Sequence, residues 1–196
     1  MNNTTLSLLL TAVLSPLALF GQITYTQTQE TTLTIAGTST LHDWTMTSTA
    51  ATCQADFAFQ ADGSPAGLSR LVVSLPAESL KSHKDAMDKN AYKALRTDQF
   101  KTITYSMLTT NIQGPIIQTT GNLTINGTTR KIDLQATCQR FSEYTLHCTG
   151  KKELKMSDYK VEAPSFMFGT IKTGDAITLS FDVKLAKSSS PNATIK

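Results

Sequence analysis

Charge is missing from the start of the chain, since no acidic or basic side chain precedes Glu30. Within that stretch residues 6–20 are almost continuously apolar, yet too few to span a bilayer comfortably. A short apolar segment that ends at Gly21 is typical of a secretory signal, so we expect residues 1–21 to be a signal peptide and the mature protein to be periplasmic or secreted. Because no Lys or Arg precedes the apolar segment, an uncleaved membrane anchor is the alternative. No later segment could cross a membrane as a helix, so no stable membrane span is expected after cleavage.

Charge of one sign is not concentrated elsewhere either. The 18 Lys and Arg residues are scattered among 15 Asp and Glu residues, which leaves a net charge of +3. Nucleic-acid binding proteins carry a basic patch or stripe, often interleaved with aromatic residues. We therefore expect no nucleic-acid partner.

The motifs of common catalytic and metal sites are missing as well. His42, His83 and His147 show none of the spacings of zinc sites, and the sequence contains no G-x-S-x-G, P-loop or G-x-G-x-x-G segment. We expect no catalytic residue, no metal and no cofactor, and hence no enzyme. A hydrolase with an unrecognised site, for which His42, Asp43 and Cys53 would be the best candidates, is the competing hypothesis.

Cysteine is scarce, with only Cys53, Cys138 and Cys148 in the chain. An oxidising compartment permits one disulfide and leaves at least one cysteine over. Cys138 and Cys148 flank a predicted turn at residues 141–144 almost symmetrically, so they could face each other across a hairpin. A bridge between them and two free buried thiols are both open.

What the sequence does contain is short stretches rich in Thr and β-branched residues, in which apolar side chains alternate and which end at Gly, Asn, Asp or Pro. That pattern predicts β-strands. The strands are expected at residues 31–37, 44–52, 53–60, 69–75, 102–108, 118–125, 131–139, 144–154 and 176–186. The dipeptide Asn126-Gly127 predicts a tight hairpin turn, because both residues tolerate positive φ.

One segment has helical spacing instead. Residues 82–98 begin with Ser82 and Asp85 in an S-x-x-D pattern and carry an apolar stripe at Met87, Ala91, Ala94 and Leu95. One helix among so many strands favours an antiparallel sheet, and closure into a barrel would remove its edges. The sequence predicts an all-β domain at residues 22–187, followed by a flexible tail at 188–196.

Large apolar and aromatic residues gather near the ends of the predicted elements. They fit either a packed core or the wall of a cavity, because an eight-stranded barrel can be filled by its own side chains or hold one small ligand. The residues are Trp44, Met87, Tyr92, Phe100, Tyr105, Phe141, Phe166, Met167 and Phe168.

An ordered set of segments runs along the chain. The segments begin with Ser-Thr-Leu-His-Asp-Trp at 39–44 and continue with 87–95, the strand from Phe100 to Tyr105, 121–130, 154–159 and 166–170. This set resembles the YceI-like family in the short form common in Bacteroidetes. No single motif is decisive, but the set covers the mature chain in order.

The resemblance implies a lipocalin-like, antiparallel barrel of about eight strands, with the helix near one opening and a lumen that holds a polyisoprenoid or isoprenoid-quinone chain. It implies that His42 contacts a ligand head group or only a turn carbonyl. The residues expected to line the lumen are Trp44, Met87, Ala91, Tyr92, Leu95, Phe100, Ile103, Tyr105, Phe166 and Phe168. The compact loops leave the length of the ligand open.

The sequence thus predicts that the protein binds, and could carry, an apolar isoprenoid-type lipid as its partner. The alternative is an exported structural or stress-related module whose barrel is filled and binds nothing. These two hypotheses differ in whether the inward side chains leave empty space.

Overall fold

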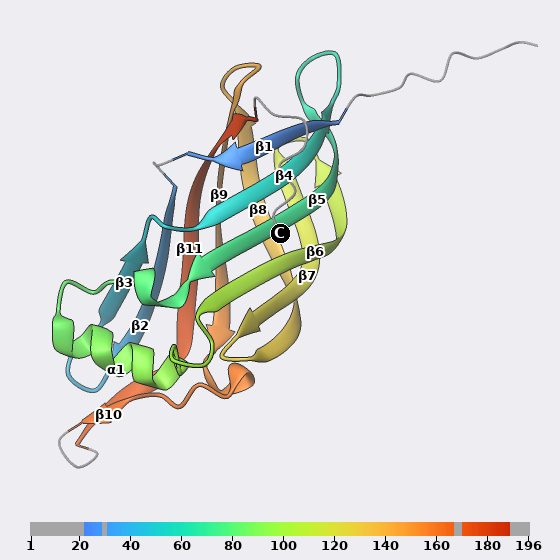
Figure 1. The fold of residues 1–196 in the computed structure, drawn as a ribbon. Coiled ribbons are helices and arrows are strands. Elements are labelled where there is room, and N and C mark those ends of the chain that lie inside the picture. The colour runs from blue at the N-terminus through green and yellow to red at the C-terminus, as the bar shows by residue number, and fades with distance from the viewer. Residues whose placement is uncertain (1–21, 29–30, 167–169, 189–196) are drawn as a thin grey trace, which may run out of the picture.

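The computed structural model describes residues 22–28, 31–166 and 170–188 (Figure 1). The predicted signal peptide at 1–21 lies outside these residues. So does the predicted tail, apart from Ser188.

Eight antiparallel strands close into a barrel. Each strand pairs with its neighbour in the order β1, β4, β5, β6, β7, β8, β9, β11, and β1 pairs with both β4 and β11. The strands are β1 (Ile23–Gln27), β4 (Thr52–Phe59), β5 (Pro65–Pro76), β6 (Thr102–Gln113), β7 (Ile116–Ile125), β8 (Thr128–Arg140), β9 (Thr145–Lys155) and β11 (Ile171–Lys187). The prediction of an all-β, lipocalin-like barrel of about eight strands is confirmed.

Three further strands lie outside this closed path, namely β2 (Thr32–Ser39), β3 (Trp44–Ser48) and the short β10 (Ser165–Phe166), of which β2 and β10 pair with β11. The last residues of β11 pair with β1, whereas Ile177 and the residues after it pair with β2, which in turn pairs with β3. At this end β3 is joined to the segment after β5 by an isolated backbone bridge between Thr47 and Lys81 and by a hydrogen bond between the hydroxyls of Ser48 and Ser79, not by a strand ladder. The barrel wall is therefore incomplete here, and helix α1 (Asp85–Leu95) lies at this end in Figure 1.

The chain-reversing features follow local chemistry. Asn126 and Gly127 have φ of 50° and 69°, and Ile125 pairs with Thr128, so the predicted tight turn between β7 and β8 is confirmed. Cys138 and Cys148 lie opposite each other on β8 and β9 and form a disulfide. Of the two alternatives for this pair, the disulfide is therefore the one present. Cys53 is free and buried.

The helix is shorter than the predicted 82–98, and Ser82 bonds to Asp88 rather than to Asp85 of the S-x-x-D pattern. Its start is set by His83, whose φ of 63° bends the chain so that Asp88, one turn further on, reaches back. The backbone N–H and the hydroxyl of Ser82 both donate to Asp88 Oδ1, at 2.8 and 2.7 Å. At the other end Arg96 adopts a left-handed conformation, which ends the helix.

Other observed strand boundaries also differ from the predicted ones for local reasons. The predicted strand 44–52 ends at Ser48, because the Ser48 hydroxyl accepts the Ala50 N–H and forms a turn before β4. The strands β1 and β10 were not predicted. Two short helical turns, η1 (Ala77–Ser79) and η2 (Ser157–Tyr159), follow β5 and β9.

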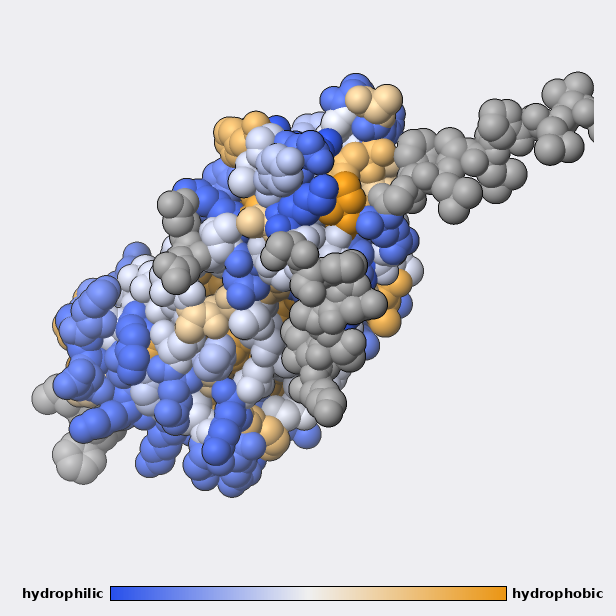
Figure 2. All heavy atoms as spheres, turned by 45° about the horizontal axis from the view of Figure 1, so that its top comes forward, coloured by the Kyte–Doolittle hydropathy of each residue, from blue (hydrophilic) through white to orange (hydrophobic). Residues whose placement is uncertain are grey.

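Alternation along the strands places apolar side chains inside and polar ones outside. In β11 the inward residues include Leu179, Phe181 and Leu185, as the sequence pattern predicts, and Asp182 between them is exposed. The face of the molecule in Figure 2 is accordingly mostly hydrophilic, with apolar residues in small areas. The core is the interior of the barrel.

Candidate functional site

The interior of the barrel is not filled. Two cavities lie inside it, a wide one of about 370 Å³ and a narrow one of about 160 Å³. The wide cavity lies at the end of the barrel covered by α1, and the narrow cavity lies deeper between the strands.

Helix α1 forms one wall of the wide cavity. The apolar stripe expected from the sequence faces inward, with Met87, Ala91, Ala94 and Leu95 on the lining. The strands β2, β3, β6 and β11 and the loop after β9 supply the remaining apolar walls. The lining residues from these segments include Ile35, Trp44, Met46, Ile103, Met156, Tyr159, Val161 and Ile177.

Several polar side chains line the wide cavity where it meets the surface. Ser39, His42, Lys84 and Asn90 belong to its lining, and His42 and Lys84 are exposed together with Leu41. Exposed lining residues mean that the cavity reaches the surface at this rim. A ligand could therefore keep a polar group here while an apolar part lies inside.

His42 is held in a turn at the rim. Its Nδ1 lies 2.7 Å from the carbonyl oxygen of Asp43, and its own carbonyl accepts the Ser39 hydroxyl at 2.7 Å. The Nδ1 contact corresponds to the structural alternative raised for His42. Its position on the cavity lining also leaves a contact with a ligand head group open.

Tyr92 and Asp88 fasten α1 over the cavity. The Tyr92 hydroxyl lies 2.8 Å from the carbonyl oxygens of both Glu78 and Leu80, and Lys81 stacks over its ring. Burial alone would raise the pKa of Asp88, but hydrogen bonds from Ser82 and the nearby charge of Lys81 hold that pKa below its ordinary value. The helix is thus tied to the barrel by polar contacts on its outer side.

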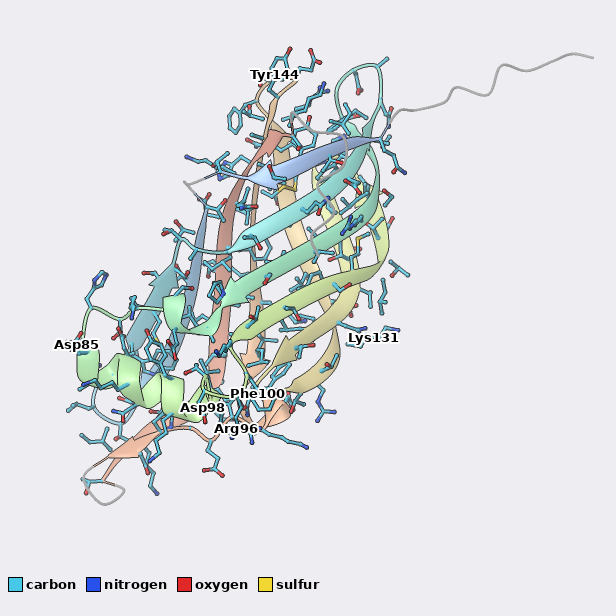
Figure 3. The ribbon with its side chains drawn as sticks, in the orientation of Figure 1. Asp85, Arg96, Asp98, Phe100, Lys131 and Tyr144 are labelled. Carbon is cyan, nitrogen blue, oxygen red and sulfur yellow. A yellow bond between two sulfur atoms is a disulfide. The ribbon has the colours of Figure 1, made fainter. Side chains whose placement is uncertain are left out.

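The far end of α1 is tied to the β7–β8 turn. Arg96 Nε donates to Asn126 Oδ1 at 2.8 Å, and the amide of the buried Asn126 donates to the carbonyl of Lys160 at 2.8 Å. The Arg96 guanidinium also lies 4.7 Å from the centre of the Phe100 ring. Figure 3 shows Arg96 and Phe100 close together at this end of the barrel and Tyr144 at the opposite end.

The narrow cavity lies among strand residues of the barrel interior. No residue that lines it is exposed. Cys53 and the Cys138–Cys148 disulfide are on its lining, and burial raises the pKa of the Cys53 thiol to about 12. Such a thiol is protonated and unreactive at neutral pH.

Tyr25 and its neighbours close the barrel beyond the narrow cavity. The Tyr25 side chain is completely buried, and its hydroxyl donates to the carbonyl of Glu143 at 2.9 Å. Its ring meets the rings of Phe57 and Phe59 edge to face. The end of the barrel away from α1 is therefore plugged.

Two buried hydroxyl groups differ in their partners. The Tyr105 hydroxyl lies 2.8 Å from the hydroxyl of Thr119, and both residues line the narrow cavity. The Tyr159 hydroxyl has no hydrogen-bond partner among the described residues. Burial raises the pKa of both tyrosines.

The structure brings six of the ten residues predicted to line the lumen onto the cavity walls. They are Trp44, Met87, Ala91, Leu95, Ile103 and Tyr105. Tyr92 and Phe100 lie elsewhere, Tyr92 against η1 and Phe100 against Arg96 and Gly127. Only the backbone of Phe166 is described, and Phe168 lies outside the described residues.

Sequence reasoning missed part of the lining. Ile35 and Ile177 carry a signal that could have placed them, because they alternate with polar residues in predicted strands. Met156, Tyr159 and Val161 follow β9 in an irregular segment with no periodicity, so only the folded chain shows that they face the cavity.

The chemistry available in the lumen is that of apolar contact. In the part of the chain that the structure describes, no group of three His, Cys, Asp or Glu side chains could hold a metal ion. Among these same residues, no helix has the length and apolar character needed to cross a membrane. The fold and the cavities together define a lipocalin-like barrel with an unfilled, apolar interior.

The chain belongs to the YceI-like domain family, since a family model with that description matches residues 25–185. Among curated proteins, no significant match is found. The resemblance to this family that the sequence segments indicated is thereby confirmed.

Solved structures share the fold. BcnA of Burkholderia cenocepacia aligns with a TM-score of 0.65 at 11% identity, over 81% of this chain and 98% of that chain. A polyisoprenoid binding domain from Saccharophagus degradans, implicated in plant cell wall breakdown, aligns with a TM-score of 0.64 at 11% identity, over 86% and 100%. The Campylobacter jejuni YceI protein aligns with a TM-score of 0.57 at 20% identity, over 68% and 80%.

Proposed function

We propose that this protein is exported and binds the hydrocarbon tail of an isoprenoid-type lipid inside its barrel, without catalysing a reaction. One observation carries the proposal: an apolar cavity of about 370 Å³ lies inside the barrel and reaches the surface beside α1. Such a volume is within the range of small-molecule sites. A barrel filled by its own side chains would have no such space.

The driving force for binding would be burial of the tail. Each CH₂ group transferred from water into an apolar lumen contributes about 0.8 kcal/mol, so a tail needs few polar contacts. Apolar walls discriminate ligands by length and shape. The description of the Saccharophagus degradans neighbour as a polyisoprenoid binding domain supports this ligand class.

The polar rim suits a head group. Lys84 and Asn90 offer donors at the surface opening, and Ser39 and His42 lie beside them on the lining. A ligand would enter tail first and keep its head group at this rim. Carriage between membranes would then require only that α1 and the rim let the tail in and out.

Export is supported by two independent features. The apolar segment within residues 1–21 fits a secretory signal, and the Cys138–Cys148 disulfide fits an oxidising compartment. Fractionation of cells that express the full chain tests this part. We expect the protein outside the cytoplasm without residues 1–21, and a cytoplasmic full-length protein would contradict export.

Native mass spectrometry of the protein purified from its exported fraction tests ligand binding. We expect a mass above that of the polypeptide, and organic extraction should release a lipid with an isoprenoid tail. Chain masses without added lipid from several expression hosts, together with no uptake of added prenols, would favour a structural module without a ligand.

A further inference from the structure

Four isoleucines stand where the two cavities meet. Ile35 of β2, Ile103 of β6, Ile125 of β7 and Ile177 of β11 are the residues that line both cavities. They come from four different strands, so together they surround the lumen rather than one side of it. We name them the isoleucine ring.

The ring is stiff. Isoleucine is branched at Cβ, which restricts χ1, and each of the four side chains is anchored in a strand. Ile35, Ile103 and Ile177 point into the barrel, yet they are only partly buried, so part of their surface faces empty space. The ring therefore faces the lumen without filling it.

The narrow cavity lies beyond the ring for a tail that enters at the rim beside α1. The narrow cavity has no exposed lining residue, and Tyr25 and the disulfide-linked hairpin close its far side. The wide cavity, in contrast, has exposed residues at its rim. A tail that enters beside α1 meets the ring after it has crossed the wide cavity.

We infer that the isoleucine ring stops the tail and sets the length of ligand that the protein accepts. This inference rests on the proposed function and narrows its ligand class to short linear isoprenoids whose tail ends at the ring. Longer tails leave their excess in water. The narrow cavity stays unoccupied by ligand in the unmodified protein.

Competition among prenols of different length tests the ring. The delipidated protein is incubated with an equimolar mixture of linear prenols from geraniol to solanesol, and the retained prenols are extracted and quantified. We expect retention to rise with length and then to level off or fall beyond a limit. In Ile177→Ala the limit should move up by at least one isoprene unit, with more than about tenfold better retention of the first prenol beyond the original limit, because each buried CH₂ changes affinity roughly fourfold.

Leu179→Ala is the matched control. Leu179 lies two residues further along β11 on the same face and lines only the narrow cavity, so its truncation removes a similar side chain beyond the ring. We expect the prenol length at which retention stops rising to be the same in Leu179→Ala as in the unmodified protein. Ile103→Ala, on another strand, should repeat the shift if Ile177→Ala does not fold, as judged by thermal unfolding.

The possible outcomes distinguish failure of the proposed lipid binding from failure of the length limit set by the isoleucine ring. Retention of no prenol by any variant overturns the proposed function and the ring with it. If the unmodified protein retains prenols of all lengths in proportion to tail length, or if Leu179→Ala shifts the limit as Ile177→Ala does, the tail already passes the ring. The proposed function then stands and the length limit fails.

Discussion

The hydroxyl of Tyr159 shows how one atom can lower stability. It is buried and lacks a hydrogen-bond partner among the described residues, so folding removes it from water without replacement. We expect Tyr159→Phe to raise the free energy of unfolding by about 1–2 kcal/mol. Urea unfolding followed by intrinsic fluorescence measures the change.

Tyr105→Phe is the control for that prediction. The Tyr105 hydroxyl is bonded to Thr119 at 2.8 Å, so its removal leaves the buried Thr119 hydroxyl alone and should cost about 1–2 kcal/mol. We therefore expect the free energy of unfolding to rise in Tyr159→Phe and to fall in Tyr105→Phe. A loss of stability in both would mean that the Tyr159 hydroxyl has a partner after all.

Cys53 makes stability depend on alkaline pH. Its thiol keeps its proton up to a pKa of about 12 in the folded protein, whereas the unfolded chain releases it near the ordinary value of 9.0. The native state then binds more protons than the unfolded state, so stability falls as pH rises from 9.0 towards 12, by up to about 1.4 kcal/mol per pH unit. Burial raises the pKa of Tyr25, Tyr105 and Tyr159 too, which adds to the fall.

Cys53→Ala isolates the share of the thiol. Its unfolding free energy should decline less steeply than that of the unmodified protein in this pH range, whatever its value at neutral pH. Equal slopes in a urea series would contradict a buried, protonated Cys53.

Residue-level roles could be predicted from the sequence only where they are local. The turn at Asn126 and Gly127 could be predicted because both residue types tolerate positive φ. That the Asn126 side chain also joins Arg96 to the carbonyl of Lys160 depends on partners about 30 residues away in both directions. No local pattern carries that information.

At the scale of elements, the Tyr92 hydroxyl is one of the polar contacts that hold α1 on the barrel. We expect Tyr92→Phe, which removes the donor to Glu78 and Leu80, to speed amide hydrogen exchange in α1 about tenfold while the strands change little. Hydrogen exchange followed by mass spectrometry measures this. Lys89→Ala, an exposed position on the same helix, is the control and should leave exchange nearly unchanged. Faster exchange in all strands would mean that Tyr92 supports the whole barrel.

Periodicity decided which elements could be predicted. The clean alternation of β11 and the stripe on α1 place their residues correctly. The prediction that Tyr92 lines the lumen did not hold, because neighbouring positions on a helix are about 100° apart and Ala91 already faces the lumen. Phe100 lies between α1 and β6, where no period applies. β1 was missed because five residues next to an apparent signal peptide offer too little pattern.

The shape of the whole molecule depends on that short strand. β1 pairs with β4 and β11, and Tyr25 within it is completely buried. A variant that begins at Thr28 would expose the edges of both neighbouring strands, so we expect it to self-associate. Size-exclusion chromatography with light scattering measures this against a control that begins at Gln22. A monomeric, stable variant would show that β1 is dispensable for closure.

The positions of the three sulfur atoms bear on how the chain matures. In an oxidising compartment three different pairings compete, but Cys138 and Cys148 are only 10 residues apart and share a hairpin, so they meet far more often than either meets Cys53. Once the barrel has closed, Cys53 is buried as a protonated thiol, and a thiol attacks a disulfide only through its thiolate. The correct pairing is thus reached first and then locked, and the mature protein needs no catalyst of disulfide isomerisation to keep it.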